Sequence, residues 1–256
     1  MRRMLLVGLL ALVSVAPRRG VAAEADQSGA PAAFDPTSAY AIEQIEGWDV
    51  YFHRRLLDGD PKLAERVRTE MTRQLAAIDA ELPADKVEQL RKSKIWVERF
   101  HPKFPCACYH PSVDWLRENG FNPEKVDSVD VSNPEHFVEW SRQQPWMMLH
   151  ELAHGYHDQV LKHGHPSVRK AYERAKASGD FEKIRHVDGR SVRHYALNND
   201  EEYFAETTEA YFGKNDFYPF DRKELREFDP EGYALMEAVW GVDTKLDDAA
   251  GSAPGQ

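Results

Sequence analysis

Hydrophobic and polar residues alternate near the start of the folded region and take up a helical spacing further along the chain. Residues 40–45 and 48–52 are two such segments, and Glu46-Gly47 between them is typical of a β-hairpin with glycine in its turn. From Pro61 the hydrophobic residues recur at helical spacing, with Asp60 placed to cap the helix. The other elements expected in this half are a short helix after Pro83, a strand over 94–100, an irregular segment over 101–111, a short helix over 113–119 and a strand over 126–131.

The second half is predicted to be mainly helical. Helices are expected over 145–163, 166–178 and 200–213, one or two more over 221–240, and mixed structure over 179–199. The chain has no internal repeat. Few strands combined with many helices indicate an α+β fold.

The two ends of the chain differ in composition from the part between them. A positively charged start, a short apolar run over 5–16 and the small residues Val21-Ala22-Ala23 are the features of a secretory signal. The apolar run is too short to span a bilayer. We therefore expect a signal peptide over 1–23, no membrane span after its cleavage, and a secreted or periplasmic protein. The remaining parts are expected to be a flexible N-terminus over 24–36, a single catalytic domain over 37–243 and a disordered tail over 244–256.

The composition favours a globular protein and argues against one that binds nucleic acid. Hydrophobic residues make up 42% of the 256 residues, as in a globular protein, and the net charge of −10 argues against nucleic acid as a partner. Cys106 and Cys108 are the only cysteines. Export would allow them to form a disulfide, although so short a ring is strained. Two thiols alone cannot build a structural zinc site with four ligands.

The main chemical signal is the sequence His150-Glu151-Leu152-Ala153-His154. Positions four apart on a helix lie on one face, so both imidazoles can reach a single ion, while Glu151 can act on a water held by that ion. Hydrophobic neighbours such as Met148 and Leu149 make this helix buried, and a buried His-Glu-His group needs a cation as partner. The pattern predicts a zinc site with a glutamate base.

A third protein ligand has to come from elsewhere in the chain. The extended motif with glycine at position 157 and histidine at 160 is excluded, because the chain has His157 and Val160 there. His157 is expected to be a supporting or surface residue. The better source is the helix over 200–213, where Glu202, Glu206 and Glu209 share one face, and one of these glutamates is expected to be the ligand.

These two motifs, together with Tyr195, resemble those of the catalytic domain of anthrax lethal factor and its relatives, a glutamate-zincin family. The resemblance covers roughly residues 95–240 and implies a zincin-like α+β fold, with a small mixed sheet, a buried motif helix and a C-terminal helical part. The chain looks like a small exported bacterial relative. The implied roles are zinc binding by His150, His154 and Glu202, general base for Glu151, stabilisation of the oxyanion or leaving group by Tyr195, and orientation of a zinc histidine through its ring N–H by Glu206.

The function implied is hydrolysis of peptide bonds, with a peptide or protein as the substrate and Zn²⁺ as the cofactor. The strand over 126–131 is a candidate for the sheet edge that pairs with an extended substrate. Two alternatives stay open. In one, Cys106 or Cys108 ligates the metal in a deformylase-like amidase. In the other, the protein is a non-catalytic, zinc-stabilised binding module, which would have no need of the base Glu151.

Overall fold

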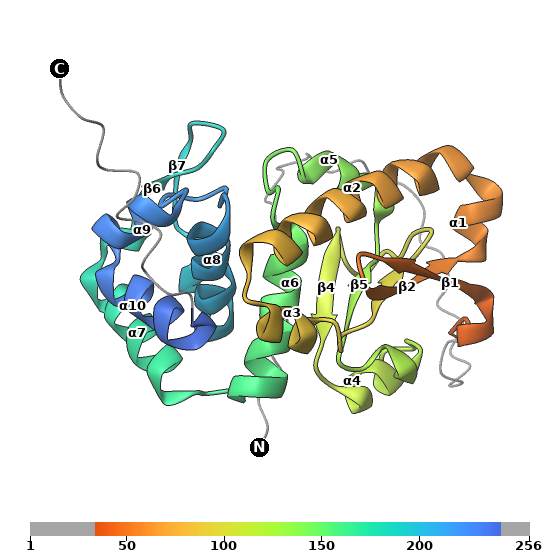
Figure 1. Ribbon diagram of the computed structural model, residues 1–256, viewed down its shortest axis with the longest axis horizontal. Coiled ribbons are helices and arrows are strands. Elements are labelled where there is room, and N and C mark those ends of the chain that lie inside the picture. The colour runs from red at the N-terminus through yellow and green to blue at the C-terminus, as the bar shows by residue number, and fades with distance from the viewer. Residues whose placement is uncertain (1–33, 242–256) are drawn as a thin grey trace, which may run out of the picture.

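The computed structural model describes residues 34–241. The expected signal peptide, residues 24–33 of the expected flexible N-terminus, and the expected tail lie outside the described residues. Figure 1 shows two parts side by side: a sheet with its covering helices, and a group of helices formed by the C-terminal third of the chain. The α+β class expected from the sequence is confirmed.

The sheet begins with the predicted hairpin, formed by β1 (Tyr40–Ile45) and β2 (Trp48–His53). Its two-residue turn places both Glu46 and Gly47 in the left-handed region, with φ of 49° and 85°. Two positive φ values are what a tight hairpin turn requires, because they match the twist of the flanking strands. The hairpin is thus specified locally, by a glycine where the backbone needs one.

Three more strands complete a mixed five-stranded sheet: β3 (Ile95–Val97), β4 (Ala107–His110) and β5 (Ser128–Val131). Their order is β1-β2-β3-β5-β4. Strands β2, β3 and β5 run parallel, whereas β1 and β4 are antiparallel to their neighbours and form the two edges. This arrangement corrects two expectations. The segment 101–111 is not wholly irregular, because it contains β4, and β5 is an interior strand with neighbours on both sides.

Helices cover one face of this sheet. The long helix α2 (Pro61–Glu81) begins as predicted, with the side chain of Asp60 accepting a hydrogen bond from the N–H of Leu63 at 3.0 Å. It contacts α5 (Pro134–Trp140) and α6 (Met147–Tyr156). The other helices of the N-terminal half are α1 (Arg54–Gly59), α3 (Ala84–Leu90) and α4 (Val113–Glu118). Apolar residues of α2 and of the strands form one core, which includes Val50, Phe52, Val67, Met71, Leu75, Ile95, Val97, Val129 and Val131.

The opposite face of the sheet carries a buried aromatic and ionic cluster. Tyr51 stacks on Trp96, and Lys125 lies over the Trp96 ring with its ammonium 2.8 Å from Asp130 of β5. Lys125 also contacts Glu98. Asp127, just before β5, is exposed, but Ser128 and Asp130 within the strand are fully buried and do not face solvent. They face this second, smaller cluster.

The C-terminal part consists of α7 (Pro166–Ser178), α8 (Asp200–Phe212), α9 (Arg222–Phe228) and α10 (Pro230–Trp240), with a ribbon of β6 (Ile184–Arg185) and β7 (Ser191–Val192). Every residue of α8 from Glu201 to Phe212 is buried. This helix lies between α6 on one side and α7 and α10 on the other. A helix that is enclosed on all sides is part of the core despite its glutamates.

The motif helix is shorter than expected. The sequence predicted one helix over 145–163, whereas α6 ends at Tyr156 and continues as a π-helical turn, η3 (His157–Leu161). π-Turns are rare and occur mostly inside or at the ends of α-helices near functional sites.

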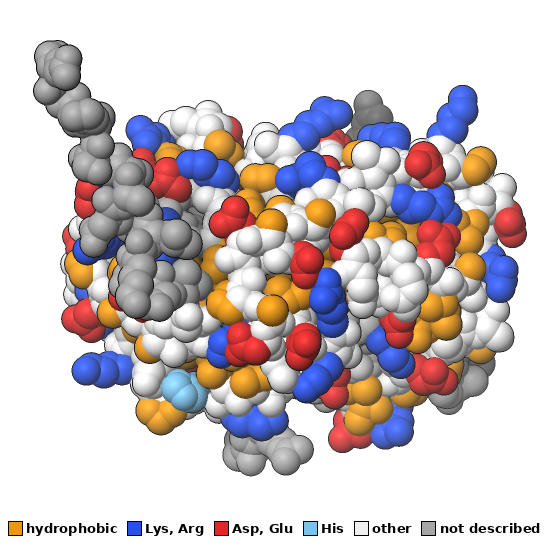
Figure 2. Space-filling model, in the orientation of Figure 1, with side chains coloured by type: hydrophobic (Ala, Val, Ile, Leu, Met, Phe, Trp, Pro, Cys, Tyr) orange, Lys and Arg blue, Asp and Glu red, His pale blue; other side chains and the backbone are white. Residues whose placement is uncertain are grey.

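The surface has a mixed charge. Figure 2 shows lysine and arginine side chains interspersed with aspartate and glutamate over the visible face. Among the described residues, no helix combines the length and the apolar character needed to cross a membrane.

Candidate metal centre

Helix α6 presents His150 and His154 towards α8. All ten residues of α6 are buried, because its apolar side chains pack between the sheet and the C-terminal helices. Each histidine is 5% exposed, and their ring centroids lie 4.8 Å apart. The four-residue spacing therefore brings the two imidazoles to one place, as the sequence predicted.

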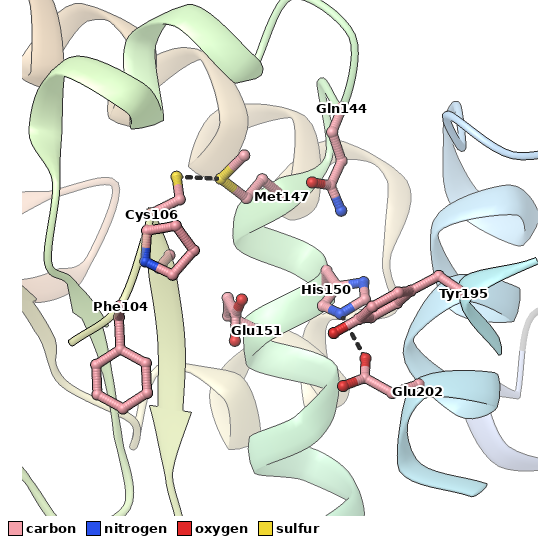
Figure 3. Close-up of a pocket in the computed structure, with 10 residues that line it drawn as sticks. Phe104, Cys106, Gln144, Met147, His150, Glu151, Tyr195 and Glu202 are labelled. Atoms are coloured by element: carbon pink, nitrogen blue, oxygen red, sulfur yellow. Dashed lines mark hydrogen bonds and ion pairs between the residues drawn. The ribbon is translucent and has the colours of Figure 1, made fainter. Parts of the chain in front are cut away.

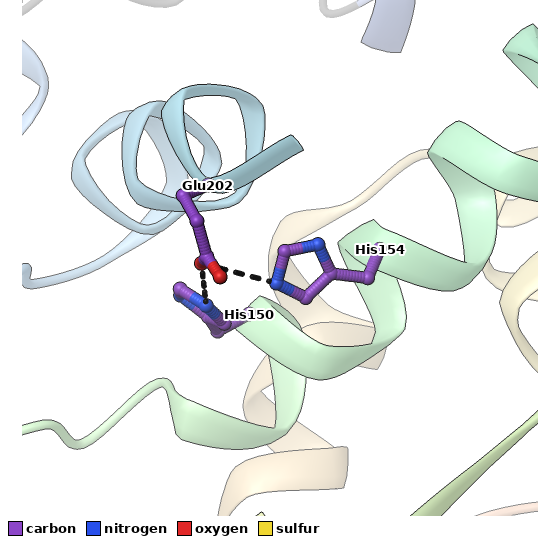
Figure 4. A group of neighbouring side chains, drawn as sticks. All are labelled: His150, His154 and Glu202. Carbon is purple, nitrogen blue, oxygen red and sulfur yellow. Dashed lines mark hydrogen bonds and ion pairs between the residues drawn. The ribbon is translucent and has the colours of Figure 1, made fainter. Parts of the chain in front are cut away.

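Helix α8 brings a carboxylate to the same place. Its cap is Asn199, whose side chain accepts a hydrogen bond from the N–H of Glu202 at 2.7 Å. This cap fixes Glu202 in the first turn, where α8 packs against α6. Glu202 is 1% exposed, and its side chain points at the two histidines, as Figure 4 shows.

The three side chains converge through single atoms. Oε2 of Glu202 lies 3.2 Å from Nε2 of His150 and 3.3 Å from Nε2 of His154. They form one of two groups of histidine, cysteine, aspartate and glutamate in the described part of the chain that could hold a metal ion. Four-coordinate zinc with bonds of about 2.0–2.1 Å holds its ligand atoms about 3.3 Å apart. The spacing of these donor atoms fits such an ion.

The charge of the site also favours a cation. Burial raises the pKa of the Glu202 carboxyl, but His154 and His150 beside it outweigh that effect and hold the pKa well below its usual range. Burial lowers the pKa of His150, yet hydrogen bonds to Glu202 and Glu209 raise it well above the ordinary value. Several buried carboxylates surround the two histidines, and a bound cation would compensate their negative charge.

Glu151, the expected general base, lies beside this group. Its side chain is 8% exposed and lines a pocket together with His150 and Glu202. Its Oε2 atom is buried and has no hydrogen-bond partner. Burial raises the pKa of this carboxyl. A buried carboxylate oxygen without a partner can still accept a hydrogen bond from a water or a substrate.

Tyr195, the expected oxyanion residue, lies on the other side of the pocket. It begins the 3-10 turn η5 (Tyr195–Leu197), which His194 caps by accepting a hydrogen bond from the N–H of Ala196. Figure 3 shows the Tyr195 ring beside His150, with its hydroxyl turned towards the pocket. Burial, and then the charge of Glu202, raise the pKa of this phenol, so it remains a proton donor.

The pocket itself is small and has one apolar wall. Its volume of about 30 Å³ leaves space for about two water molecules. The lining residues are Phe104, Pro105, Cys106, Ala107, Gln144, Met147, His150, Glu151, Tyr195 and Glu202. The wall opposite His150 is the segment that leads into β4, and β4 is an edge strand. The expectation that residues 126–131 form the edge of the sheet is wrong, because β4 pairs with β5 and is the edge strand itself.

The glutamates further along α8 lie behind His150. The resemblance assigned the orientation of a zinc histidine to Glu206, but the closest carboxylate oxygen to His150 Nδ1 belongs to Glu209, at 2.7 Å. Oε1 of Glu206 is 3.7 Å from the same nitrogen. With His150 these two glutamates make up the second group that could hold an ion.

Both cysteines are free thiols and are buried. Sγ of Cys106 lies 3.4 Å from the sulfur of Met147, and Sγ of Cys108 lies 3.7 Å from Nε2 of His110. Burial raises the pKa of both thiols. Neither cysteine belongs to a possible metal-binding group among the described residues. The disulfide and the Cys-ligated metal site considered from the sequence are absent from this arrangement.

His157 is not a surface residue. It is fully buried at the start of η3, its ring packs against Phe204 with centroids 5.2 Å apart, and neither ring nitrogen has a hydrogen-bond partner. Burial lowers its pKa to about 4, so the ring is neutral at physiological pH. It belongs to neither group that could hold an ion.

Sequence reasoning missed several residues of the site. Gln144, Phe104 and Met147 line the pocket, and nothing in their local sequence marks them. Glu209 was among the three glutamates on the predicted face, but its role was not distinguished. Comparisons of the chain with protein-family models, with curated protein sequences and with solved structures gave no match. The resemblance to the glutamate-zincins therefore stays a prediction.

Proposed function

We propose that this protein is an exported zinc-dependent metallopeptidase with a zincin-like catalytic domain. One observation carries the proposal: His150, His154 and Glu202 converge at distances that suit a tetrahedral ion, next to the unpartnered carboxylate oxygen of Glu151. Three protein ligands leave a fourth position open, as in catalytic zinc sites. A purely structural site would have no need of Glu151. Export rests on the signal peptide expected over residues 1–23.

The roles of the side chains follow from their positions. When bound, zinc would lower the pKa of a water and polarise the substrate carbonyl. Glu151 faces the pocket, so its carboxylate can accept the proton of that water as it attacks the carbonyl carbon. The same carboxyl can then return the proton to the leaving nitrogen. Burial, which raises the pKa of Glu151, suits a group that must both take up and release a proton.

Tyr195 would act on the opposite side of the reacting carbonyl. Its phenol keeps its proton, because burial and the neighbouring carboxylates raise its pKa. A neutral hydroxyl at this point can donate a hydrogen bond to the oxygen that becomes negative when the carbonyl carbon is attacked. The phenol and the base thus lie in one pocket and have separate tasks.

The substrate we expect is an extended stretch of a peptide or protein. Strand β4 is the open edge next to the pocket, and sheet edges bind extended chains through main-chain hydrogen bonds. The pocket wall formed by Phe104, Pro105 and Met147 is apolar and offers no charged group to a substrate side chain. We therefore expect uncharged side chains to be preferred beside the cleaved bond.

Metal content and cleavage of an unfolded, dye-labelled protein would test the proposal. We expect about one zinc per chain and chelator-sensitive cleavage. Glu151→Gln should keep the zinc and lose cleavage by about 10²–10⁴-fold, because only the base is removed. Glu202→Ala should lose the zinc. Glu139→Gln, an exposed glutamate of α5, is the matched control and should change neither.

Other outcomes would point elsewhere. Zinc retained in full by Glu202→Ala would move the third ligand to another residue. Zinc bound by a chain that cleaves nothing, with Glu151→Gln indistinguishable from the native protein, would contradict the peptidase proposal and support a zinc-stabilised binding module.

A further inference from the structure

The two ring nitrogens of His150 both face carboxylates. Nε2 lies 3.2 Å from Glu202, on the side of the candidate metal position, and Nδ1 lies 2.7 Å from Oε1 of Glu209, on the far side. A neutral imidazole carries one proton. If Nε2 gives its lone pair to a metal, the proton must be on Nδ1, where it needs an acceptor.

Glu209 is held in place for this contact. Its side chain is fully buried, and the same oxygen, Oε1, accepts a second hydrogen bond from the amide Nε2 of Gln144 at 2.9 Å. Gln144 precedes α6 and lines the pocket, and Figure 3 shows it beside His150. Glu209 is two helical turns beyond Glu202, so α8 brings both carboxylates to one histidine.

Glu206 does not compete for this position. Its Oε1 is 3.7 Å from Nδ1 of His150, which is beyond hydrogen-bond distance, and its Oε2 is 3.9 Å from Nδ1 of His194. The main-chain carbonyl of Glu206 accepts a hydrogen bond from the side chain of Asn215 at 3.1 Å.

We propose that Glu209, anchored by Gln144, is the positioning residue that keeps the proton of His150 on Nδ1 and turns Nε2 towards the metal. The contact between His150 and Glu209 is then an orienting device rather than part of a second metal site, because Nδ1 cannot both donate to Glu209 and bind an ion. The inference rests on the proposed metal site, and it moves the supporting role from Glu206 to Glu209. Carboxylates that orient metal-bound histidines typically contribute 10–100-fold in metal affinity.

The test uses the full chain with ¹⁵N-labelled histidine. In the zinc-free protein we expect a low-field, slowly exchanging ring N–H signal of His150, which is identified by its absence in His150→Gln. The signal should disappear in Glu209→Ala and persist in Glu206→Ala, the matched control on the same helix face. Zinc affinity, measured by competition with a chelator, should fall about 10–100-fold in Glu209→Ala and less than threefold in Glu206→Ala. Glu209→Gln keeps an acceptor oxygen and should recover part of the affinity.

The outcomes separate this inference from the proposed function. A ring N–H signal and zinc affinity that survive in Glu209→Ala, or that are lost instead in Glu206→Ala, would overturn the role of Glu209 and leave the metallopeptidase intact. Two zinc ions per chain, with the second lost in both glutamate variants, would overturn it in favour of a second metal site. A native protein that shows the Glu209-dependent signal but binds no zinc would refute the metallopeptidase while supporting the contact. Far-ultraviolet circular dichroism of each variant checks that the loss is not caused by unfolding.

Discussion

Nε2 of His154 lies 3.3 Å from Oε2 of Glu202, so this pair of candidate ligands connects α6 with α8. An ion bound between them would bind the folded chain and not the unfolded one. Free zinc at about 1,000 times its dissociation constant would therefore add about 4 kcal/mol to the free energy of unfolding. For a chain of this size, that corresponds to a rise in Tm of roughly 8–16 °C. Thermal unfolding with zinc and with excess chelator measures the shift. His154→Ala should abolish the difference between the two conditions. A native protein with the same Tm in zinc and in chelator would contradict the metal site.

Replacing Tyr195 with phenylalanine removes the hydroxyl and leaves the ring in place. We expect kcat for peptide cleavage to fall about 10²–10³-fold, with KM and zinc content nearly unchanged, because the hydrogen bond is needed only as charge develops on the oxygen. Steady-state kinetics on a fluorogenic peptide would measure this. Tyr218→Phe, on a tyrosine outside the pocket, is the control. Equal kcat in the Tyr195 variant and the native protein would remove Tyr195 from the mechanism.

Gly155 allows a close approach between α6 and β4. A Cβ atom at this position would lie 3.1 Å from the Ser93 hydroxyl and 3.1 Å from the Tyr109 ring. Gly155→Ala should therefore lower the free energy of unfolding by about 1–3 kcal/mol, because the ring and hydroxyl must shift to make room. Urea unfolding measures the change. Gly59→Ala, where nothing lies within 4 Å, should be neutral or stabilising. A Gly155 variant as stable as the Gly59 variant would show that the contact can relax.

Removing only one partner of the buried ion pair between Lys125 and Asp130 should lower the free energy of unfolding strongly. Lys125→Met removes the ammonium that contacts both buried carboxylates, Glu98 and Asp130. We expect a loss of about 3–5 kcal/mol in the free energy of unfolding at pH 7. Lys92→Met, on an exposed lysine, is the control and should change it by less than about 0.5 kcal/mol. A Lys125 variant within that range would mean that the carboxylates have another source of compensation.

The same pair predicts a dependence of stability on pH. Burial raises the pKa of Asp130, but Lys125 and then His110 outweigh it and hold the pKa below its usual range. The ionised carboxylate therefore stabilises the fold at pH values above the unfolded pKa of about 3.9, and this contribution is lost as the pH falls through the folded pKa. The difference in the free energy of unfolding between the native protein and Asp130→Asn should be largest near pH 7 and shrink below about pH 4. A difference that grows towards acid pH would contradict this sign.

Much of this architecture could be predicted from local sequence. The hairpin turn at Glu46-Gly47, the cap of α2 at Asp60 and the two histidines of α6 each depend on residues a few positions apart. Strand β4 could not be found in this way. It follows two prolines and contains no β-branched residue, and it exists because its backbone pairs with β5.

In the candidate site, too, local sequence predicts some features and tertiary packing decides the others. Helical spacing placed Glu202, Glu206 and Glu209 on one face, but their individual contacts depend on how α8 is rotated against α6. That rotation places Glu209, two turns beyond Glu202, at Nδ1 of His150. Gln144 was missed for a related reason, since it reaches the site only through the fold of the segment between α5 and α6.

The shortness of β4 limits how long any chain could stay beside the candidate site. In a strand of four residues only about two turn their N–H and C=O groups to the free side. Each hydrogen bond formed there would contribute about 0.5–1.5 kcal/mol. Bound segments would therefore have short residence times, and both cleaved ends could leave quickly. An inhibitor designed for slow release would have to take its affinity from the metal position and the apolar wall rather than from pairing with the strand.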